Sequence, residues 1–287
     1  MMKELGLDYP KCVLGRLLNV SASGYYAWVD RPLSRRAQEE VRLELEIRAA
    51  HKQTRQTYGP ERLQRDLAEH GVRVGIWRIK RIRKKLGICC KQKRKFKVTT
   101  DSGHRLPVAE NLLGQQFKVC KPNTVWVTDI TYVATDEGWL YLAGHKDLFT
   151  GEIVGYAMGE RITRNLVSQS LLRALRAKRT ARGLMHHSDR GSQYCSQEYT
   201  GLLERFGLRS SMSGKGNCSD NAPMESFWGT LKQELVLHRH YGSRLEAVRE
   251  ITEYIEIFYN RQRRQPRLGF LSPAAYEHRF YPGLSAA

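Results

Sequence analysis

The sequence has no long hydrophobic run and no regular cysteine framework. No apolar stretch in its 287 residues approaches the roughly 20 residues of a membrane span. The N-terminus, MMKELGLDYPKC, lacks the apolar segment of a secretory signal. The six cysteines form no CxxC pair, which argues against a zinc finger and favours reduced thiols. These absences predict a cytoplasmic protein without a membrane segment.

Negative charge is also scarce. The chain holds 48 Lys and Arg against 29 Asp and Glu, which gives a formal net charge of +19 and a pI near 9.9. Residues 72–97 carry twelve Lys or Arg and no acidic residue. A basic surface that served only solubility would be mixed in sign, so this segment favours contact with nucleic acid.

The N-terminal third has the pattern of short helices. Two are expected within residues 12–28, joined at Asn19–Ser21, with Ser21 or Ser23 as an N-cap. A longer helix of mixed charge follows over residues 39–54. The length of the chain is enough for about two domains, so this helical part is expected to be separate from a second one.

A helix-turn-helix is expected next. Pro60 opens a helix that Gly71 ends, and a second helix begins near Gly75. An ordinary helical hairpin has the same pattern, but the basic bias of the second helix favours one that enters the major groove of DNA. Its apolar face is Ile76, Ile79, Ile82 and Leu86. Its predicted DNA contacts are Arg78, Lys80, Arg81, Lys84 and Lys85.

Beyond a stretch without periodicity from Lys91 to about Lys118, which predicts a linker, the pattern becomes α/β. β-Branched and aromatic runs alternate with turns and then with amphipathic stretches. Strands are expected at 124–135, 139–148, 152–159, 184–188 and 208–212, and helices at 163–179, 197–207 and 222–235. This order predicts a mixed sheet flanked by helices.

Three carboxylates stand out in this domain. Asp129 lies inside the most strand-like segment, where a charge is costly unless it is compensated. Asp189 ends a short strand in LMHHSDRGSQY, and Glu225 lies in the first turn of the long helix. Carboxylates from a central strand, a neighbouring strand end and an abutting helix can converge on one point. Oxygen-only ligands suit Mg²⁺ or Mn²⁺, and a pair of such ions supports phosphodiester chemistry.

Each carboxylate also has an ordinary structural interpretation, which the residues alone leave open. Asp129 can pair with a buried cation. Asp189 can cap the turn before Gly191 or pair with Arg190. Glu225 can oppose the dipole at the start of its helix.

Four further residues compete for the same roles. Asp147 is expected to close its strand before a hairpin turn, and Asp220 or Asn221 to cap the long helix. The strand histidines His186 and His187 are expected to pack in the core, or to orient a carboxylate from behind.

Four segments resemble one family. WVTDITYV, HHSDRGSQY, SMSGKGNCSDNAPMESFWGTLK and YIEIFYNRQRRQPRLGFLSP are similar to the catalytic subunit (OrfB) of insertion sequence three family transposases, which are relatives of retroviral integrases. VSASGYYAW and YGPERLQRDL extend the resemblance to the N-terminal part. The resemblance implies an α/β, RNase H-like catalytic core with an N-terminal all-α helix-turn-helix region and a short helical C-terminal extension.

The resemblance also implies an activity and a site. Asp129, Asp189 and Glu225 are then both the catalytic triad and the ligands of two Mg²⁺ ions, with Mn²⁺ as a substitute. Such enzymes hydrolyse DNA at the ends of the element to free a 3′-hydroxyl, which then attacks another phosphodiester. The first joining is expected to link one end to the other and give a circular intermediate.

Further DNA contacts follow from the same resemblance and from local charge. Lys232 lies two helical turns beyond Glu225 and either holds terminal DNA phosphates or is a solvent lysine. Lys215, in the glycine-containing loop before the helix, is expected to touch the scissile strand. The C-terminal cluster is expected to bind the DNA backbone through Arg261, Arg263, Arg264 and Arg267.

The expected organisation has five parts. They are a helical segment at 1–34, a helix-turn-helix domain at 35–98, a basic linker at 99–118, the integrase-like core at 119–239 and a basic helical extension at 240–287. The expected partners are double-stranded DNA, as terminal inverted repeats and target, and further copies of the chain in a dimer or higher oligomer. An upstream OrfA portion, fused or associated, would supply the leucine zipper, since no sustained heptad pattern is present. The expected location is the bacterial cytoplasm, at the nucleoid.

Two other functions remain open from the sequence. A non-catalytic DNA-binding regulator of the element would need the helix-turn-helix alone and would tolerate loss of Asp129. A nuclease acting on RNA–DNA hybrids would share the core and would have no need of the basic N-terminal helices.

Overall fold

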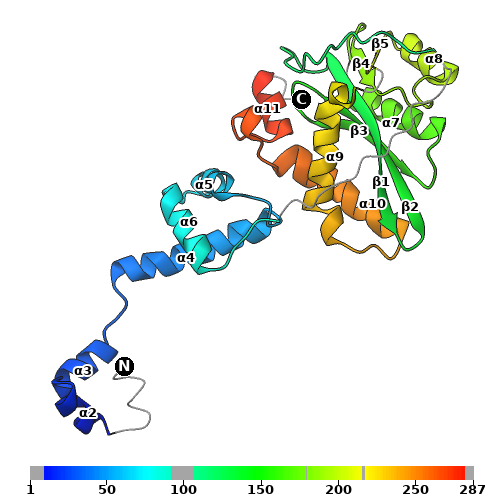
Figure 1. Ribbon diagram of the computed structural model, residues 1–287. Helices are drawn as coiled ribbons and strands as arrows, with labels where there is room; N and C mark the ends of the chain where they lie inside the picture. Colours follow the sequence, from blue (N-terminus) through cyan, green and yellow to red (C-terminus); the bar gives the residue numbers. More distant parts are fainter. Residues whose placement is uncertain (1–9, 92–106, 179, 215–216, 282–287) are drawn as a thin grey trace.

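The computed structural model describes residues 10–91, 107–178, 180–214 and 217–281. An N-terminal series of helices leads into an α/β domain, against which the C-terminal helices pack (Figure 1). The first helices are α2 (Lys11–Leu17) and α3 (Ala22–Val29). Ser21 is the N-cap of α3, since its hydroxyl accepts a hydrogen bond from the Gly24 amide at 3.0 Å.

The helix-turn-helix region consists of α4 (Arg35–Gln53), α5 (Pro60–Glu69) and α6 (Ile76–Lys85). Pro60 occupies the first position of α5, where its missing amide hydrogen is not needed. Gly71 has φ of +82°, which permits the turn after α5, and Gly75 begins α6. The buried side chains that join the three helices are Leu43, Ile47, Leu63, Leu67, Ile79 and Ile82.

The α/β domain contains a five-stranded sheet in the order β3-β2-β1-β4-β5. The strands are β1 (Val125–Thr135), β2 (Gly138–Asp147), β3 (Ile153–Gly159), β4 (Met185–Ser188) and β5 (Arg209–Met212). The first three form an antiparallel meander, whereas β4 and β5 run parallel to β1. The two parallel strands each follow a helix, as right-handed crossovers require.

Helices cover both faces of the sheet, as Figure 1 shows for α7 and α9. Alternation along β1 sends Trp126 to the layer of α7 (Arg164–Ala177) and α8 (Gln197–Arg205). It sends Val127 to the opposite layer, formed by α9 (Ala222–Glu234) and α10 (Arg244–Glu253). The sheet is therefore buried on both sides, and its strands carry apolar residues in both registers.

The C-terminal segment belongs to the same packed unit. After α10 the chain continues as a π-helical stretch, η3 (Tyr254–Gln262), a short turn, η4 (Pro266–Leu268), and α11 (Pro273–Phe280). Tyr254 and Phe258 are buried in the layer of α9 and α10. Tyr58, at the start of α5, joins this layer and donates its hydroxyl to the Gln262 carbonyl at 3.1 Å. The helix-turn-helix region is therefore docked on the C-terminal segment.

The expected linker at 99–118 needs a correction. Residues 107–118 run along the open edge of the sheet, where the Glu110 carbonyl accepts a hydrogen bond from the Met212 amide. The amides of Leu112 and Leu113 both donate to the Ser211 hydroxyl, and Leu113 is only 3% exposed. This part of the segment is bound to the core, while residues 99–106 lie outside the described part of the chain.

The strands and helices expected between residues 124 and 235 are all confirmed, in order and within a few residues of their bounds. Within the described residues, no helix combines the length and the apolar character that crossing a bilayer would need.

Candidate active site

The register of the sheet brings Asp129 and Asp189 together. Val127 of β1 pairs with His187 of the parallel strand β4. Two residues further along each strand stand Asp129, still inside β1, and Asp189, immediately after β4. Because parallel neighbours keep the same offset, the two carboxylates fall at matching positions on adjacent strands.

Glu225 comes to the same end of these strands because the start of α9 is fixed against the sheet. The Asn221 side chain donates to the Thr128 carbonyl at 2.9 Å, and the Lys146 ammonium donates to the Pro223 carbonyl at 2.8 Å. Glu225 follows in the first turn of the helix. These two hydrogen bonds anchor the residues on either side of the helix start to β1 and β2.

Gly144 allows the helix to approach so closely. It pairs with Asp129 across the β1–β2 ladder. A Cβ atom at Gly144 would lie 2.9 Å from both the Met224 Cε and the Trp228 ring. The two side chains of α9 therefore occupy the space beside Asp129 that any other residue at position 144 would fill.

Burial and like charge both act on Asp129. Burial raises the pKa of this carboxyl to about 8, and the negative charges of Asp189 and Glu225 add to the effect. The Ile130 amide donates to Asp129 at 2.8 Å and the Gly191 amide donates to Asp189 at 2.9 Å. Negative charge thus gathers at this edge of the sheet, which is the electrostatic environment of a cation site.

Lys232 shares this environment. It is buried on α9, two turns beyond Glu225, with its ammonium 4.8 Å from the ring centre of Tyr132. Burial lowers the pKa of Lys232 to about 8, while the charge of Asp129 opposes that change. Its alternative interpretation as a solvent lysine is wrong.

The donor set matches a hard divalent cation in kind, because all three candidate ligands are carboxylates. Within the described ranges, no three His, Cys, Asp or Glu side chains are gathered tightly enough to hold a metal ion as they stand. Glu225 is the exposed member of the three.

The competing aspartates have structural roles. Asp147 accepts hydrogen bonds from the Asn123 amide and from both the amide and the hydroxyl of Thr150, so it fixes the turn after β2. Asp220 accepts four hydrogen bonds, which tie the loop before α9 to the segment of residues 107–118. Its donors are Asn111, Gln115, Gly214 and Asn217.

The strand histidines are packed, as expected. His186 lies in a buried network in which its ring nitrogen is 3.1 Å from His145 and 2.9 Å from the Tyr199 hydroxyl. Burial lowers the pKa of His186 to about 3, so it is neutral. His187 contacts the hydroxyls of Ser211 and Ser213. Neither ring has a described contact with the three carboxylates.

The five residues of α6 that are predicted to contact DNA divide into two groups. Arg78, Arg81 and Lys85 form ion pairs with α4 at 3.0, 2.7 and 2.5 Å, and their partners are Glu39, Glu40 and Glu44. Lys80 and Lys84 lie on a different side of the helix, and the Lys80 ammonium stands 5.1 Å from the ring centre of Trp77. Trp77 is 80% exposed, and sequence reasoning missed it.

The C-terminal arginines need a correction. Arg263 is 8% exposed and is bound through two nitrogens to the buried carboxylate of Glu234, so the expected contact with DNA is wrong for this residue. Arg264 is engaged with Asp66 and Glu69 of α5. Arg261 remains exposed, and Lys215 lies outside the described residues.

Comparison with known proteins identifies the domains of the chain. An integrase core domain model matches residues 120–218, a second integrase core domain model matches residues 225–280, and an HTH-like domain model matches residues 37–96. The catalytic core of human T-cell lymphotropic virus 2 integrase, solved with magnesium, is 16% identical with a TM-score of 0.44, over 55% of this chain and 97% of that one. The family matches define an integrase-type recombinase with a helix-turn-helix.

Two relatives specify the family. The chain is 59% identical over 266 residues to the insertion element IS600 uncharacterized 31 kDa protein of Shigella sonnei, over 93% of this chain and 98% of that protein. It is 40% identical to the transposase InsF for insertion sequence IS3A of Escherichia coli K12, over 92% of each. The chain belongs to the IS3 family of transposases. It therefore binds DNA and acts in transposition, in the polynucleotidyl transferase class.

Proposed function

We propose that the protein cleaves DNA at the ends of its insertion sequence and joins the freed 3′-hydroxyl to a second phosphodiester. The observation that supports this most directly is that Asp129 on β1, Asp189 at the end of β4 and Glu225 at the start of α9 lie near enough for the charges of the last two to act on Asp129. A regulator that only bound DNA would have no use for a partly buried carboxylate beside two others.

Both reactions are displacements at phosphorus, in which one oxygen attacks and a 3′-oxygen leaves. In the first, the oxygen of water forms a bond to phosphorus and the 3′-oxygen of the element leaves as a hydroxyl. In the second, that hydroxyl attacks another phosphodiester and the 3′-oxygen of the attacked strand leaves, so the number of phosphodiester bonds is conserved. Each is an in-line displacement in which the attacking oxygen loses a proton and the leaving oxygen develops charge.

Asp129, Asp189 and Glu225 would hold Mg²⁺, or Mn²⁺ in its place, as two ions. Bound there, the ions supply activation of the attacking oxygen and stabilisation of the leaving oxygen. Lys232 lies on the same flank of α9 and presents a cation next to Asp129, which suits a phosphate of the terminal DNA. Lys215, in the loop that precedes α9, is proposed to contact the scissile strand.

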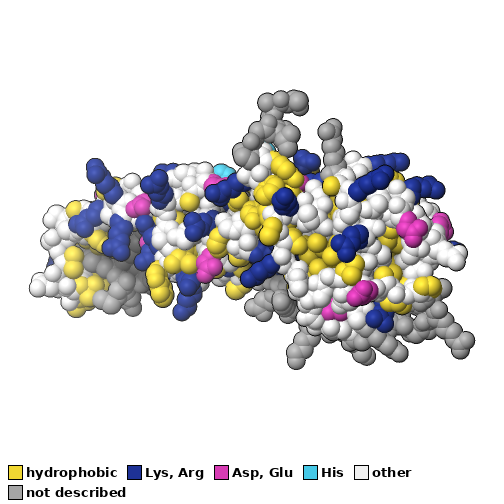
Figure 2. All heavy atoms as spheres, turned by 90° about the horizontal axis from the view of Figure 1, so that it is seen from above, with side chains coloured by type: hydrophobic (Ala, Val, Ile, Leu, Met, Phe, Trp, Pro, Cys, Tyr) yellow, Lys and Arg dark blue, Asp and Glu magenta, His cyan; other side chains and the backbone are white. Residues whose placement is uncertain are grey.

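The helix α6 is proposed to contact DNA through one of its three faces. Its first face is buried, and its second carries the residues paired with α4. The third presents Trp77, Lys80 and Lys84 at helical spacing toward solvent. Figure 2 shows that Lys and Arg side chains lie along the whole length of the molecule, with fewer acidic ones between them. Arg261 adds a further contact on the C-terminal segment.

The assembly is proposed to hold two element ends, and therefore at least two copies of the chain on DNA. An upstream portion, fused or associated, would contribute end recognition and a leucine zipper.

The test is a strand-cleavage and joining assay on duplexes that carry the terminal inverted repeats. Wild type is compared with Asp189→Asn in Mg²⁺, in Mn²⁺ and with both chelated. Asp136→Asn is the matched control, because Asp136 is exposed and pairs only with His240 among the described residues. Metal-dependent activity in wild type and control but not in a folded, DNA-binding Asp189→Asn would support the proposal. Equal activity in all three proteins would refute it, and tight binding without cleavage in wild type would favour the regulator.

A further inference from the structure

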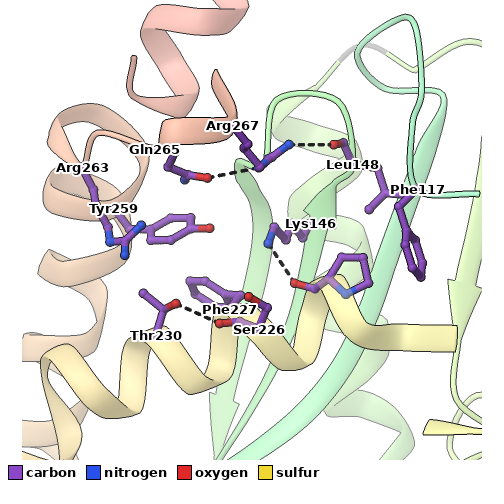
Figure 3. A pocket seen from close by; sticks show the side chains of 11 residues that line it. Phe117, Lys146, Leu148, Ser226, Phe227, Thr230, Tyr259, Arg263, Gln265 and Arg267 are labelled. Atoms are coloured by element: carbon purple, nitrogen blue, oxygen red, sulfur yellow. Dashed lines mark hydrogen bonds between the residues drawn. The ribbon is translucent and has the colours of Figure 1, made fainter. Parts of the chain in front are cut away.

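A cavity of about 270 Å³, lined by both apolar and cationic side chains, lies on the flank of α9 opposite the three carboxylates. Figure 3 shows α9 along one side of it, with Lys146 of β2 and the C-terminal side chains Gln265 and Arg267 facing inward. Pro223, Ser226 and Thr230 line it from the helix, whereas Glu225 and Lys232 fall on the other side at helical spacing. The cavity is therefore separate from the candidate active site but shares its helix.

Two positive charges in this cavity have no counter-charge. Lys146 is 7% exposed, and within the described ranges its ammonium is bound to the Pro223 carbonyl alone. Arg267, at the mouth, is bound to the carbonyls of Leu148 and Phe149 and to the Gln265 side chain. Among the residues that the structure describes, no carboxylate lies within ion-pair distance of either cation or lines the cavity. Only Arg263 is neutralised, by Glu234.

The amide of Gln265 adds an unused donor. Gln265 is 6% exposed, and its Nε2 makes no hydrogen bond with the described part of the chain, although the Tyr259 hydroxyl is near. Its Oε1 is occupied by Arg267 at 3.3 Å. A buried N–H without an acceptor is unfavourable, and a buried cation without an anion is more so. One acceptor-rich anion would offer an acceptor to each of these three groups.

We propose that this cavity binds a phosphate group between Lys146, Arg267 and Gln265. Phosphate offers only acceptor oxygens and a charge that matches two cations. The volume exceeds the roughly 30 Å³ of one water several-fold, so a hydrated phosphate has room. Gly151 leaves room for Arg267, because a Cβ at position 151 would overlap the guanidinium of Arg267.

Such a phosphate has two sources, a backbone phosphate of DNA or a free anion. The first rests on the proposed function, whereas binding of free phosphate does not. Either source would act on α9, because Lys146 holds the carbonyl of Pro223, two residues before Glu225. An anion that draws the ammonium toward the cavity therefore changes how the start of α9 is held.

The experiment is calorimetric titration of the full chain with inorganic phosphate at pH 6.5, against chloride at matched ionic strength. Wild type is compared with Lys146→Met and Arg267→Gln. Arg176→Gln is the control, since Arg176 is exposed on α7 and far along the chain from the cavity. We expect one saturable site in wild type and control, and affinity at least tenfold weaker in both cavity variants.

Wild type that binds phosphate no better than chloride would overturn the proposal, and so would equal affinity in all four proteins. This result does not depend on catalysis, so it is separate from failure of the proposed function. Arg267 lies at the exposed mouth, so Arg267→Gln remains informative where Lys146→Met fails to fold. A second arm measures binding of a DNA duplex against salt. If a DNA phosphate occupies the cavity, the slope of duplex affinity against salt concentration should be smaller by about one in Arg267→Gln than in wild type. If wild type binds inorganic phosphate but the two proteins have the same slope, the ligand is the free anion.

Discussion

Gly144 shows how one residue without a side chain sets the position of the candidate active site. A Cβ at this position would come within 2.9 Å of Met224 and Trp228 on α9. We predict that Gly144→Ala lowers the free energy of unfolding by about 1–3 kcal/mol, because overpacking must displace the helix. Since Glu225 moves with α9, the rate of strand cleavage should fall at least tenfold even after correction for the fraction of protein that is folded.

The matched control is Gly159→Ala, on β3, where the nearest side-chain atom to a new Cβ, on Leu166, lies at an ordinary 3.5 Å. Denaturant unfolding and single-turnover cleavage measure the two effects. A Gly144→Ala protein with wild-type stability and wild-type cleavage would contradict the packing argument.

Lys146 predicts a pH dependence of stability. Burial lowers the pKa of Lys146 to about 7, and the charges of Arg267 and Arg263 act in the same direction. In the unfolded chain a lysine titrates near 10.4. Between these values the unfolded state binds the proton that the folded state has lost, so the free energy of unfolding rises with pH. The rise from pH 7 to 9 is at most about 2–3 kcal/mol, since one pKa unit corresponds to about 1.4 kcal/mol.

The measurement is urea unfolding between pH 7 and 9 in phosphate-free buffer, for wild type and Lys146→Met. The variant has no amine at this position, so the free energy of unfolding of wild type should rise relative to that of Lys146→Met as the pH rises. Parallel curves would show that Lys146 keeps its ordinary pKa.

The residues that sequence reasoning could identify are those whose chemistry conflicts with their local pattern. Asp129 stands out because a carboxylate is rare within a β-branched run. Gly144 and Lys146 do not, because a glycine and a lysine inside GHKD also fit a strand end. Their roles depend on α9, which lies some eighty residues later in the chain. Glu234 is hidden as the partner of Arg263 for the same reason, since the two residues are 29 positions apart in the chain and belong to different elements.

At the scale of elements, the five residues of α6 that are predicted to contact DNA lie on two different sides of the helix, whereas the sequence pattern predicts a single basic helix without distinguishing them. Periodicity predicts the buried face, but only the structure shows that α4 occupies a second face through Glu39, Glu40 and Glu44. We predict that Lys84→Ala weakens DNA binding and lowers its salt slope by about one, because a phosphate contact is lost. Arg81→Gln is the control on the same helix and should leave the slope unchanged.

Trp77 lies on the same outer face of α6 and should contribute to duplex affinity without changing the salt slope. Trp77→Ala is expected to weaken duplex binding at every salt concentration, since the ring is 80% exposed and carries no charge. Fluorescence anisotropy across a salt series distinguishes these cases. The proposed face would be wrong if Arg81→Gln, and not Lys84→Ala, reduced the slope.

The ion pair between Arg263 and Glu234 joins η3 to the end of α9, and Tyr254 donates to the same carboxylate at 2.7 Å. We predict that Arg263→Met costs about 3–5 kcal/mol of stability, because a buried charge is left without its partner. Adding Glu234→Leu removes that charge and should restore most of the loss. Losses that simply add in the double variant would contradict a coupled pair.

Most elements could be predicted from sequence, because periodicity and turn residues specify them locally. The exception is the segment at 107–118, which has neither. It is held by backbone amides on the Ser211 hydroxyl and by side chains on Asp220. Such bonds to distant residues leave no periodic signal, so the segment has the sequence pattern of a linker.

At the scale of the whole molecule, the helix-turn-helix region and the α/β domain meet at the C-terminal segment. Tyr58 donates to the Gln262 carbonyl and accepts from the Arg264 amide, while Arg264 pairs with Asp66 and Glu69. The helix α6, which is proposed to contact DNA, and the domain that carries the three candidate carboxylates are thereby joined through this segment. That arrangement suits an enzyme that must hold an element end while it acts on it.

The central claim is that Asp129, Asp189 and Glu225 act as one unit in cleaving and joining DNA. The most direct measurement is single-turnover cleavage of a terminal-repeat duplex in Mn²⁺ by Asp129→Asn, Asp189→Asn and the double variant, each shown to be folded and to bind the duplex. If the residues form one site, each single variant falls to the background rate and the double variant is no slower, because effects within one unit do not add. A double variant slower than either single variant by the product of their separate losses would contradict the account, as would near-wild-type cleavage by Asp189→Asn.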